Sequence, residues 1–245
     1  MNKNETKREV PTNERVEWRG IFLQNLRDNP ERSETPLTPY LESGNKKVGF
    51  KSKAYSSVFV WNMPTVRTCP GASKWCLTHC YNADERKEVY AHDKWEVNLL
   101  CFERNRSELE QFLINELNKP IGRCAVRVHS SGDFFSNDYI RFWRRISEKC
   151  PKASFWAYTR SWAVGELLDD LEILKSQHNF QLFASWDKTM PDPPNGWRVS
   201  FVYSQDTDSA LMPGLLCPEE RTHTNCAKCR YCIEHGDGNV LFREH

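Results

Sequence analysis

CAVRVHSSGDFFSNDYIRFWRRISEKCPKASFWAYTR, residues 124–160, contains the pattern that decides the fold. Residues 124–130 alternate apolar and polar side chains as a strand does, and residues 154–160 form a second strand-like run. Between them, residues 137–150 have helical spacing and stop at Pro151. The apolar positions of this helix are Tyr139, Phe142, Trp143 and Ile146. A strand, a helix and a strand in succession predict two parallel strands joined by a helical crossover.

The same alternation continues on both sides of this stretch. Strand-like runs cover residues 56–64, 179–185 and 197–204, and helical runs cover residues 83–103, 107–119 and 163–177. The segment DKTMPDPPNG, residues 187–196, replaces the helix expected between the last two strands. The sequence therefore predicts an α/β fold, a partial (β/α) barrel with parallel strands and a Cys-rich C-terminal metal-binding extension.

Composition divides the chain into three parts. Residues 1–55 are polar and form an N-terminal arm and a loosely structured lead-in. Residues 56–205 form the α/β partial-barrel catalytic domain. Residues 206–245 form a Cys-rich tail that is too short for a core of its own, so it needs a metal or the main domain to hold it.

The overall composition excludes several classes of protein. The chain has 245 residues, 27% of them charged, with a formal net charge of +1. It has no apolar run near the roughly 20 residues of a membrane-spanning helix and no signal-peptide pattern. We therefore expect a cytoplasmic protein with no membrane contact, whose 10 cysteines are reduced. The net charge gives nucleic-acid binding no support.

Three cysteines, Cys69, Cys76 and Cys80, follow the strand of residues 56–64 and are called here the first cysteine group. Three thiolates on one loop can hold three corners of an iron-sulfur cluster and leave one iron open. A structural zinc site would need a fourth ligand, and the candidate, His79, adjoins Cys80.

Four cysteines near the C-terminus, Cys217, Cys226, Cys229 and Cys232, form the second cysteine group. Its C-x-x-C-x-x-C spacing, completed by the upstream cysteine, is typical of a metal site, and it suits a 4Fe-4S cluster or zinc. The other cysteines, Cys101, Cys124 and Cys150, lie within or at the ends of predicted helices and strands. We expect them to be buried as small apolar side chains.

Polar side chains follow the predicted strands, where parallel α/β sheets bind ligands. The candidate ligand-binding residues are Ser130, Ser131, Gly132, Asp133 and Ser185. The candidate catalytic residues are Asp133, Tyr158 and Arg160. The glycine would let the backbone approach a ligand, Asp133 would accept from an ammonium or hydroxyl group, and Arg160 would bind an anion. The alternative for SSGDFFSND, residues 130–138, is a loop that only caps the next helix.

The cysteine loop after the first strand and the small-Gly-acid loop after the second resemble the radical S-adenosylmethionine superfamily. The resemblance implies that the first cysteine group binds a 4Fe-4S cluster and that Ser131, Gly132 and Asp133 hold the amino group of S-adenosylmethionine. The cysteines of the first cysteine group are separated by six and by three residues, whereas the common spacing in the superfamily is three and two residues.

The runs TCPGASKWCLTHCY, SGDFFS and CAKCRYC, the last followed by VLFREH, resemble the phage-associated gene product 88 family over residues 56–245. This second resemblance names a family and leaves the chemistry open, whereas the resemblance to the radical S-adenosylmethionine superfamily implies an enzyme with one or two 4Fe-4S clusters that cleaves S-adenosylmethionine reductively. Its electrons would come from a flavodoxin or ferredoxin, and its substrate could be a nucleotide or nucleic acid. The alternative is a zinc-stabilised nucleic-acid-binding or processing protein of phage type.

Overall fold

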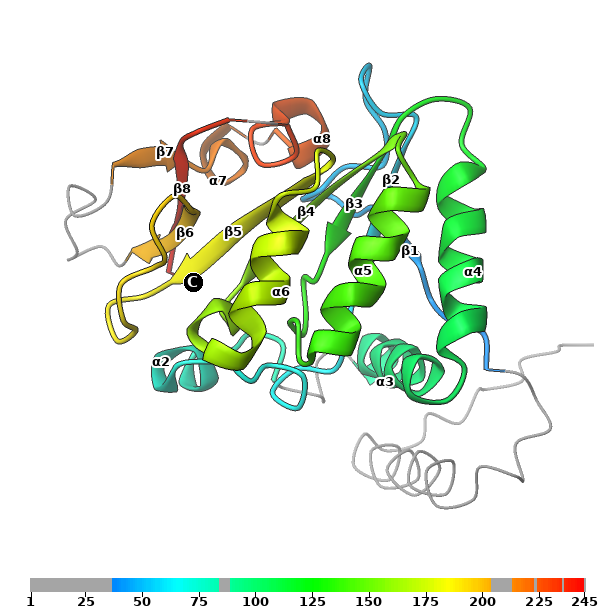
Figure 1. Ribbon diagram of the computed structural model, residues 1–245. Coiled ribbons are helices and arrows are strands. Elements are labelled where there is room, and N and C mark those ends of the chain that lie inside the picture. Colours follow the sequence, from blue (N-terminus) through cyan, green and yellow to red (C-terminus); the bar gives the residue numbers. More distant parts are fainter. Residues whose placement is uncertain (1–36, 84–88, 204–212, 223, 235, 245) are drawn as a thin grey trace, which may run out of the picture.

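The computed structural model describes residues 37–83, 89–203, 213–222, 224–234 and 236–244 (Figure 1). The strands are β1 (Glu42–Ser43), β2 (Ser57–Trp61), β3 (Cys124–Val128), β4 (Ala153–Thr159), β5 (Phe180–Trp186), β6 (Arg198–Tyr203), β7 (Gly214–Leu216) and β8 (Asn239–Arg243). The helices are α2 (Lys74–Thr78), α3 (Val89–Arg104), α4 (Arg106–Asn118), α5 (Asn137–Lys149), α6 (Gly165–Lys175), α7 (Pro218–Thr222), α8 (Cys226–Cys229) and the 3-10 turn η2 (Ser161–Ala163).

All described strands belong to one open sheet of eight strands in the order β1-β2-β3-β4-β5-β6-β8-β7. β1 pairs antiparallel with β2, and every other pair is parallel. Helices α4, α5 and α6 cover one face of the sheet (Figure 1). The predicted α/β class and its parallel strands are confirmed, and the sheet is not closed. No described helix connects β5 to β6, as the proline-rich segment predicted.

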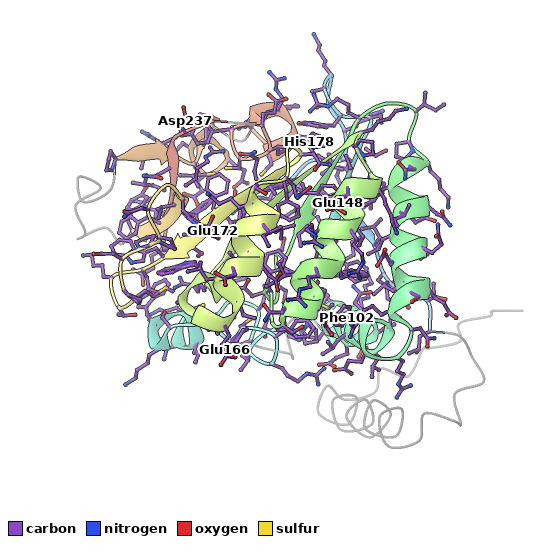
Figure 2. The ribbon with its side chains drawn as sticks, in the orientation of Figure 1. Phe102, Glu148, Glu166, Glu172, His178 and Asp237 are labelled. Atoms are coloured by element: carbon purple, nitrogen blue, oxygen red, sulfur yellow. The ribbon has the colours of Figure 1, made fainter. Side chains whose placement is uncertain are left out.

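The helix-covered face contains the main core. Val126 and Val128 of β3 and Phe155 of β4 point into it and are fully buried. The predicted apolar positions of α5 are all fully buried as well: Tyr139, Phe142, Trp143 and Ile146. Figure 2 shows Phe102 beside the first turn of α5, and its ring meets that of Tyr139 edge-on at 4.9 Å. Aromatic packing thus fixes α3 and α5 against the sheet.

The opposite face of the sheet is covered by the C-terminal segment. Ala227 and Ile233, in and just after α8, pack on Val60 and Trp156. Arg198 of β6 donates to the carbonyl oxygens of residues 231, 234 and 238 and so anchors this segment. β8 extends the sheet between β6 and β7. The main domain therefore holds the described C-terminal residues, one of the two alternatives that the sequence left open, and these residues complete the sheet and one of its covering layers.

The segment before β2 also differs from the predicted loose lead-in. Val48 and Tyr55 are fully buried. The buried side chain of Asn98 on α3 exchanges hydrogen bonds with the backbone N–H and carbonyl of Tyr40. Residues 37–55 therefore pack into the fold, whereas residues 1–36 of the predicted arm lie outside the described residues.

Two further expectations concern burial and membranes. Cys101, Cys124 and Cys150 are 4%, 0% and 0% exposed, so their prediction as buried apolar side chains is confirmed. Within the described ranges, no helix is long and apolar enough to cross a lipid bilayer.

Truncation of the α5 core will destabilise the whole fold. Trp143→Ala removes a fully buried indole, so we expect the free energy of unfolding to fall by about 3–5 kcal/mol. Urea denaturation followed by circular dichroism measures it. Ile121→Ala, at a residue that is 100% exposed, is the control and should change stability by less than about 0.5 kcal/mol. Equal effects of the two substitutions would contradict this account of the core.

Candidate functional site

The first cysteine group lies on the segment that follows β2, at the carboxyl edge of the sheet. Ser73 begins α2 by accepting a 3.0 Å hydrogen bond from the backbone N–H of Cys76. Cys69 precedes this short helix and Cys80 follows it, and all three thiols are partly exposed. Figure 1 shows α2 at the edge where β3, β4 and β5 end. The local sequence therefore places the three thiols where the strand ends open.

A buried ion pair attaches this cysteine segment to the sheet. The guanidinium of Arg160, just after β4, pairs with the carboxylate of Asp187, just after β5. The hydroxyl of Ser73 donates to the same carboxylate at 2.6 Å. Burial alone would raise the pKa of Asp187, but the donors around it hold that pKa below its ordinary value. Arg160 was predicted to bind an anion or carboxylate, and in the structure it pairs with the carboxylate of Asp187.

Gly71 lets the cysteine segment lie directly against the backbone after β4. A Cβ atom at this position would stand 2.1 Å from the carbonyl oxygen of Arg160, where no side chain fits. The absence of a side chain, rather than an unusual backbone angle, is what the position requires.

The loop after β3 joins the cysteine segment to the end of β4. The carboxylate of Asp133 accepts hydrogen bonds from the hydroxyl of Thr159 at 2.6 Å and from the backbone N–H of Arg160 at 2.8 Å. It accepts a third from the N–H of Phe134. Burial raises the pKa of Asp133, and these hydrogen bonds oppose the rise. The carboxylate predicted to meet a cofactor therefore holds the loop in place.

The neighbouring residues of this loop also contact the cysteine segment. Gly132 has a φ of 80°, and a Cβ there would stand 2.6 Å from that of Met63. The hydroxyl of Ser131 donates to the carbonyl oxygen of Met63 at 3.0 Å. The carbonyl oxygen of Ser130 accepts from Asn82 at 2.9 Å. The glycine was expected to let the backbone approach a ligand, and here it leaves room for Met63 and Thr68. The cap of α5 comes from Ser136.

A buried histidine follows β3. His129 has a φ of 70°, a left-handed conformation that is uncommon for residues other than glycine. Burial lowers its pKa to about 3, so the ring is neutral near pH 7. The hydroxyl of Tyr139 accepts from the indole N–H of Trp61 at 3.0 Å and lies 2.9 Å from Nε2 of His129.

The second cysteine group lies across the sheet from the helices. Cys226 and Cys229 are the first and last residues of α8, which Asn225 caps. The backbone N–H of Cys226 donates to the carbonyl oxygen of Lys47 at 3.1 Å, so α8 is held by the segment before β2. Tyr158 and Cys232 pack against the same buried cluster.

A cavity of about 310 Å³ lies between the two cysteine groups. Both groups border it, and so does each candidate ligand-binding and catalytic residue at the strand ends. The predicted residues on its wall are Cys69, Cys76, Cys80, Ser130, Ser131, Gly132, Asp133, Tyr158, Arg160, Ser185, Cys217, Cys226, Cys229 and Cys232. The structure therefore brings together all the residues that the sequence singled out.

Burial keeps several of these thiols protonated in the absence of a metal. Burial raises the pKa of Cys69 to about 12, that of Cys226 to about 11 and that of Cys232 to about 12. Such thiols are protonated at neutral pH, and a bound metal would displace the proton. Among the described residues, however, no three or more Cys, His, Asp or Glu side chains converge on one point as ligands of a metal ion. The seven thiols thus share a cavity without forming a closed ligand set.

The family of the chain follows from its sequence. A family model described as Gene product 88 matches residues 35–237. The chain belongs to this family. Its relatives include the Gene 88 proteins of Mycobacterium phages L5 and D29, each 25% identical, with alignments that cover 90% of this chain and 98% of each relative. The resemblance to the gene product 88 family is confirmed. No solved structure matches the chain.

Three residues of the site were not among the predicted ones, Ser73, Gly71 and Arg127, and Asp187 was predicted only as a polar residue at the end of a strand. The first two lie in the predicted cysteine loop, where serine and glycine are common for reasons of backbone geometry alone. The role of Asp187 depends on its ion pair with Arg160, which is distant in sequence. Arg127 did carry a signal, because a charged residue inside a buried parallel strand is unusual.

The neutral state of His129 predicts a dependence of stability on pH. Its pKa is about 3 in the folded protein, against an ordinary value of 6.5, so the unfolded chain takes up a proton that the folded one does not. The stabilisation is complete above pH 6.5 and is lost as the pH falls toward 3. His129→Asn keeps a residue that tolerates positive φ and removes this titration. We expect the wild type to lose up to about 1.4 kcal/mol more per pH unit in this window, measured by urea denaturation. Parallel curves would contradict the assignment.

The ion pair between Arg160 and Asp187 predicts that removing one of its two charges will strongly lower the free energy of unfolding. Asp187→Asn leaves the buried guanidinium of Arg160 without a counter-charge, so stability should fall by about 3–5 kcal/mol. Asp138→Asn, in an exposed pair with Arg106, is the control and should cost under about 1 kcal/mol. The double substitution Arg160→Met with Asp187→Leu should be more stable than Asp187→Asn. Thermal unfolding compares them, and similar losses in the two single variants would show that the pair does not hold the site.

Proposed function

We propose that this protein is an iron-sulfur enzyme that cleaves S-adenosylmethionine reductively and starts radical chemistry on a substrate in the cavity. One observation carries the proposal. The first cysteine group follows β2, the first parallel strand, the loop of Ser131, Gly132 and Asp133 follows β3, and both border the same cavity at the carboxyl edge. This order along the chain and in space is what the resemblance to the radical S-adenosylmethionine superfamily implies.

The first cysteine group would hold a 4Fe-4S cluster with one open iron. When bound, such a cluster supplies an electron and a coordination site for S-adenosylmethionine. The ion pair of Arg160 with Asp187, joined by Ser73, would keep the three thiols at the carboxyl edge. The surrounding walls would exclude water from reactive intermediates. The sequential order of β2 to β6, with helices on one face, supports a partial barrel.

The second cysteine group would hold a further metal site on the far wall of the cavity. Its four thiols fit a cluster or zinc by chemistry. Asn225 caps α8, and Lys47 accepts a backbone hydrogen bond from it, so the segment is positioned by protein contacts on both sides. Tyr158 borders the cavity and packs against the same buried cluster as Cys232. In the cell, a flavodoxin or ferredoxin would supply the electrons.

The zinc-stabilised nucleic-acid-binding alternative has less support. Basic side chains of α5 form ion pairs with carboxylates of the same chain: Arg141 pairs with Asp170 at 3.0 Å, and Arg145 pairs with Glu110 at 2.8 Å. Its large apolar residues face the core. Phosphate backbones are usually bound by a stripe of free cations, which this helix does not present.

Anaerobic reconstitution with iron and sulfide tests the proposal. Wild-type protein should turn brown, bind iron and sulfide, and release 5'-deoxyadenosine from S-adenosylmethionine when dithionite is added. Cys76→Ala should lose about four irons per chain and release no 5'-deoxyadenosine, because one thiolate of the open cluster is missing. Cys101→Ala, at a buried cysteine that does not border the cavity, is the matched control and should keep both.

The metal and sulfide content of the protein distinguishes the iron-sulfur enzyme from the zinc protein. Stoichiometric zinc and no sulfide in the wild type would overturn the proposal in favour of a zinc protein. Full iron content and activity in Cys76→Ala would show that the first cysteine group does not hold the reactive cluster.

A further inference from the structure

Arg127 lies in the middle of β3 and points away from the helices. Its neighbours Val126 and Val128 are fully buried in the core under α4 and α5. Because successive side chains of a strand alternate between the two faces, Arg127 faces the C-terminal segment. Its half-buried side chain borders the cavity between the two cysteine groups.

The guanidinium of Arg127 has no counter-charge in the part of the chain that the structure describes. Its charge centre lies 5.5 Å from the ring centroid of Tyr158, a cation-π contact that satisfies no N–H group. Its Nε atom is buried and has no hydrogen-bond partner among the described residues. Arginine keeps its charge at any pH that a protein tolerates, and a buried charge is normally paired.

The other cations near the cavity are satisfied by the protein itself or lie in solvent. Arg160 pairs with Asp187, and Lys47 lies 3.7 Å from Glu219. Arg198 donates to backbone carbonyl groups and to Gln181. Arg243 also borders the cavity, but its side chain is exposed. Among the described cations that border the cavity, Arg127 is therefore the one inside the fold whose N–H donors have no protein acceptor and can bind another molecule.

We propose that Arg127 binds an oxyanion, a carboxylate or a phosphate, of the molecule that occupies the cavity. The planar guanidinium offers paired N–H donors that match either group. Tyr158 supports the guanidinium from one side through its ring. The inference rests on the proposed function only in taking this molecule to be the substrate, which would then be anionic.

The second cysteine group offers another role for the same charge. Arg127 acts electrostatically on Cys226, so it could serve only to balance thiolates there. Substitution separates the two roles, because balancing thiolates affects metal content, whereas binding an oxyanion affects the response to added anions.

The test compares wild type, Arg127→Gln and Arg127→Lys, with Arg243→Gln as the matched control. Unfolding temperature is followed while sodium phosphate or sodium succinate is added, with sodium chloride at equal ionic strength as the reference. A ligand that binds only the folded state raises the midpoint, and the titration gives its dissociation constant. We expect one anion to stabilise the wild type and Arg243→Gln. Arg127→Gln should bind it about tenfold to a hundredfold more weakly. Arg127→Lys, which keeps the charge, should be intermediate and shows that the position tolerates substitution.

Three outcomes overturn the inference. Neither anion stabilising the wild type beyond chloride would show that the cavity binds no oxyanion, and equal affinities in wild type and Arg127→Gln would show that Arg127 is not the ligand. Loss of metal from Arg127→Gln with unchanged anion affinity would assign the residue to the second cysteine group.

The anion that stabilises the protein also identifies the class of substrate. A stronger effect of phosphate than of succinate would support a phosphate-bearing substrate, and the reverse a carboxylate. Because anion binding is measured without S-adenosylmethionine, it can succeed even if the proposed reaction fails.

Discussion

The buried ion pair between Arg160 and Asp187 is the interaction on which the rest of the site depends. It joins the ends of β4 and β5, and through the hydroxyl of Ser73 it also fixes the helix that carries Cys76. A charge in a protein interior is stable only with a partner, so the two strand ends and the cysteine segment must assemble together. Asp133 extends the same network to the loop after β3.

The two faces of the sheet have different chemistry because each strand alternates. On β3, the valines pack under the helices, whereas Arg127 faces the cavity. On β4, Phe155 is in the helix-covered core, and Tyr158 faces the second cysteine group. One face is thus free to build a stable apolar core while the other carries polar and sulfur groups. The C-terminal segment covers that second face and, by doing so, encloses the cavity.

Much of the architecture was predictable from residue spacing. The helical repeat of Tyr139, Phe142 and Trp143 identified both α5 and its buried side, because a helix on a sheet buries one stripe. The place of β8 was not predictable, since a short strand beside β6 is specified by partners distant in sequence. The burial of Val48 was missed for a similar reason: its segment is polar overall and is ordered by contacts with α8.

The sequence by itself determined the fold class, the strand ends and the two cysteine groups, because these depend on local periodicity and on residue type. Only the tertiary structure decided what the charges do. Arg160 and Asp133 were expected to meet a ligand, yet each is satisfied by the protein, while Arg127 has no counter-charge among the described residues around the cavity. The attraction between two charged side chains depends on the distance between them, and for residues on different strands this distance is set by the fold and cannot be read from the sequence.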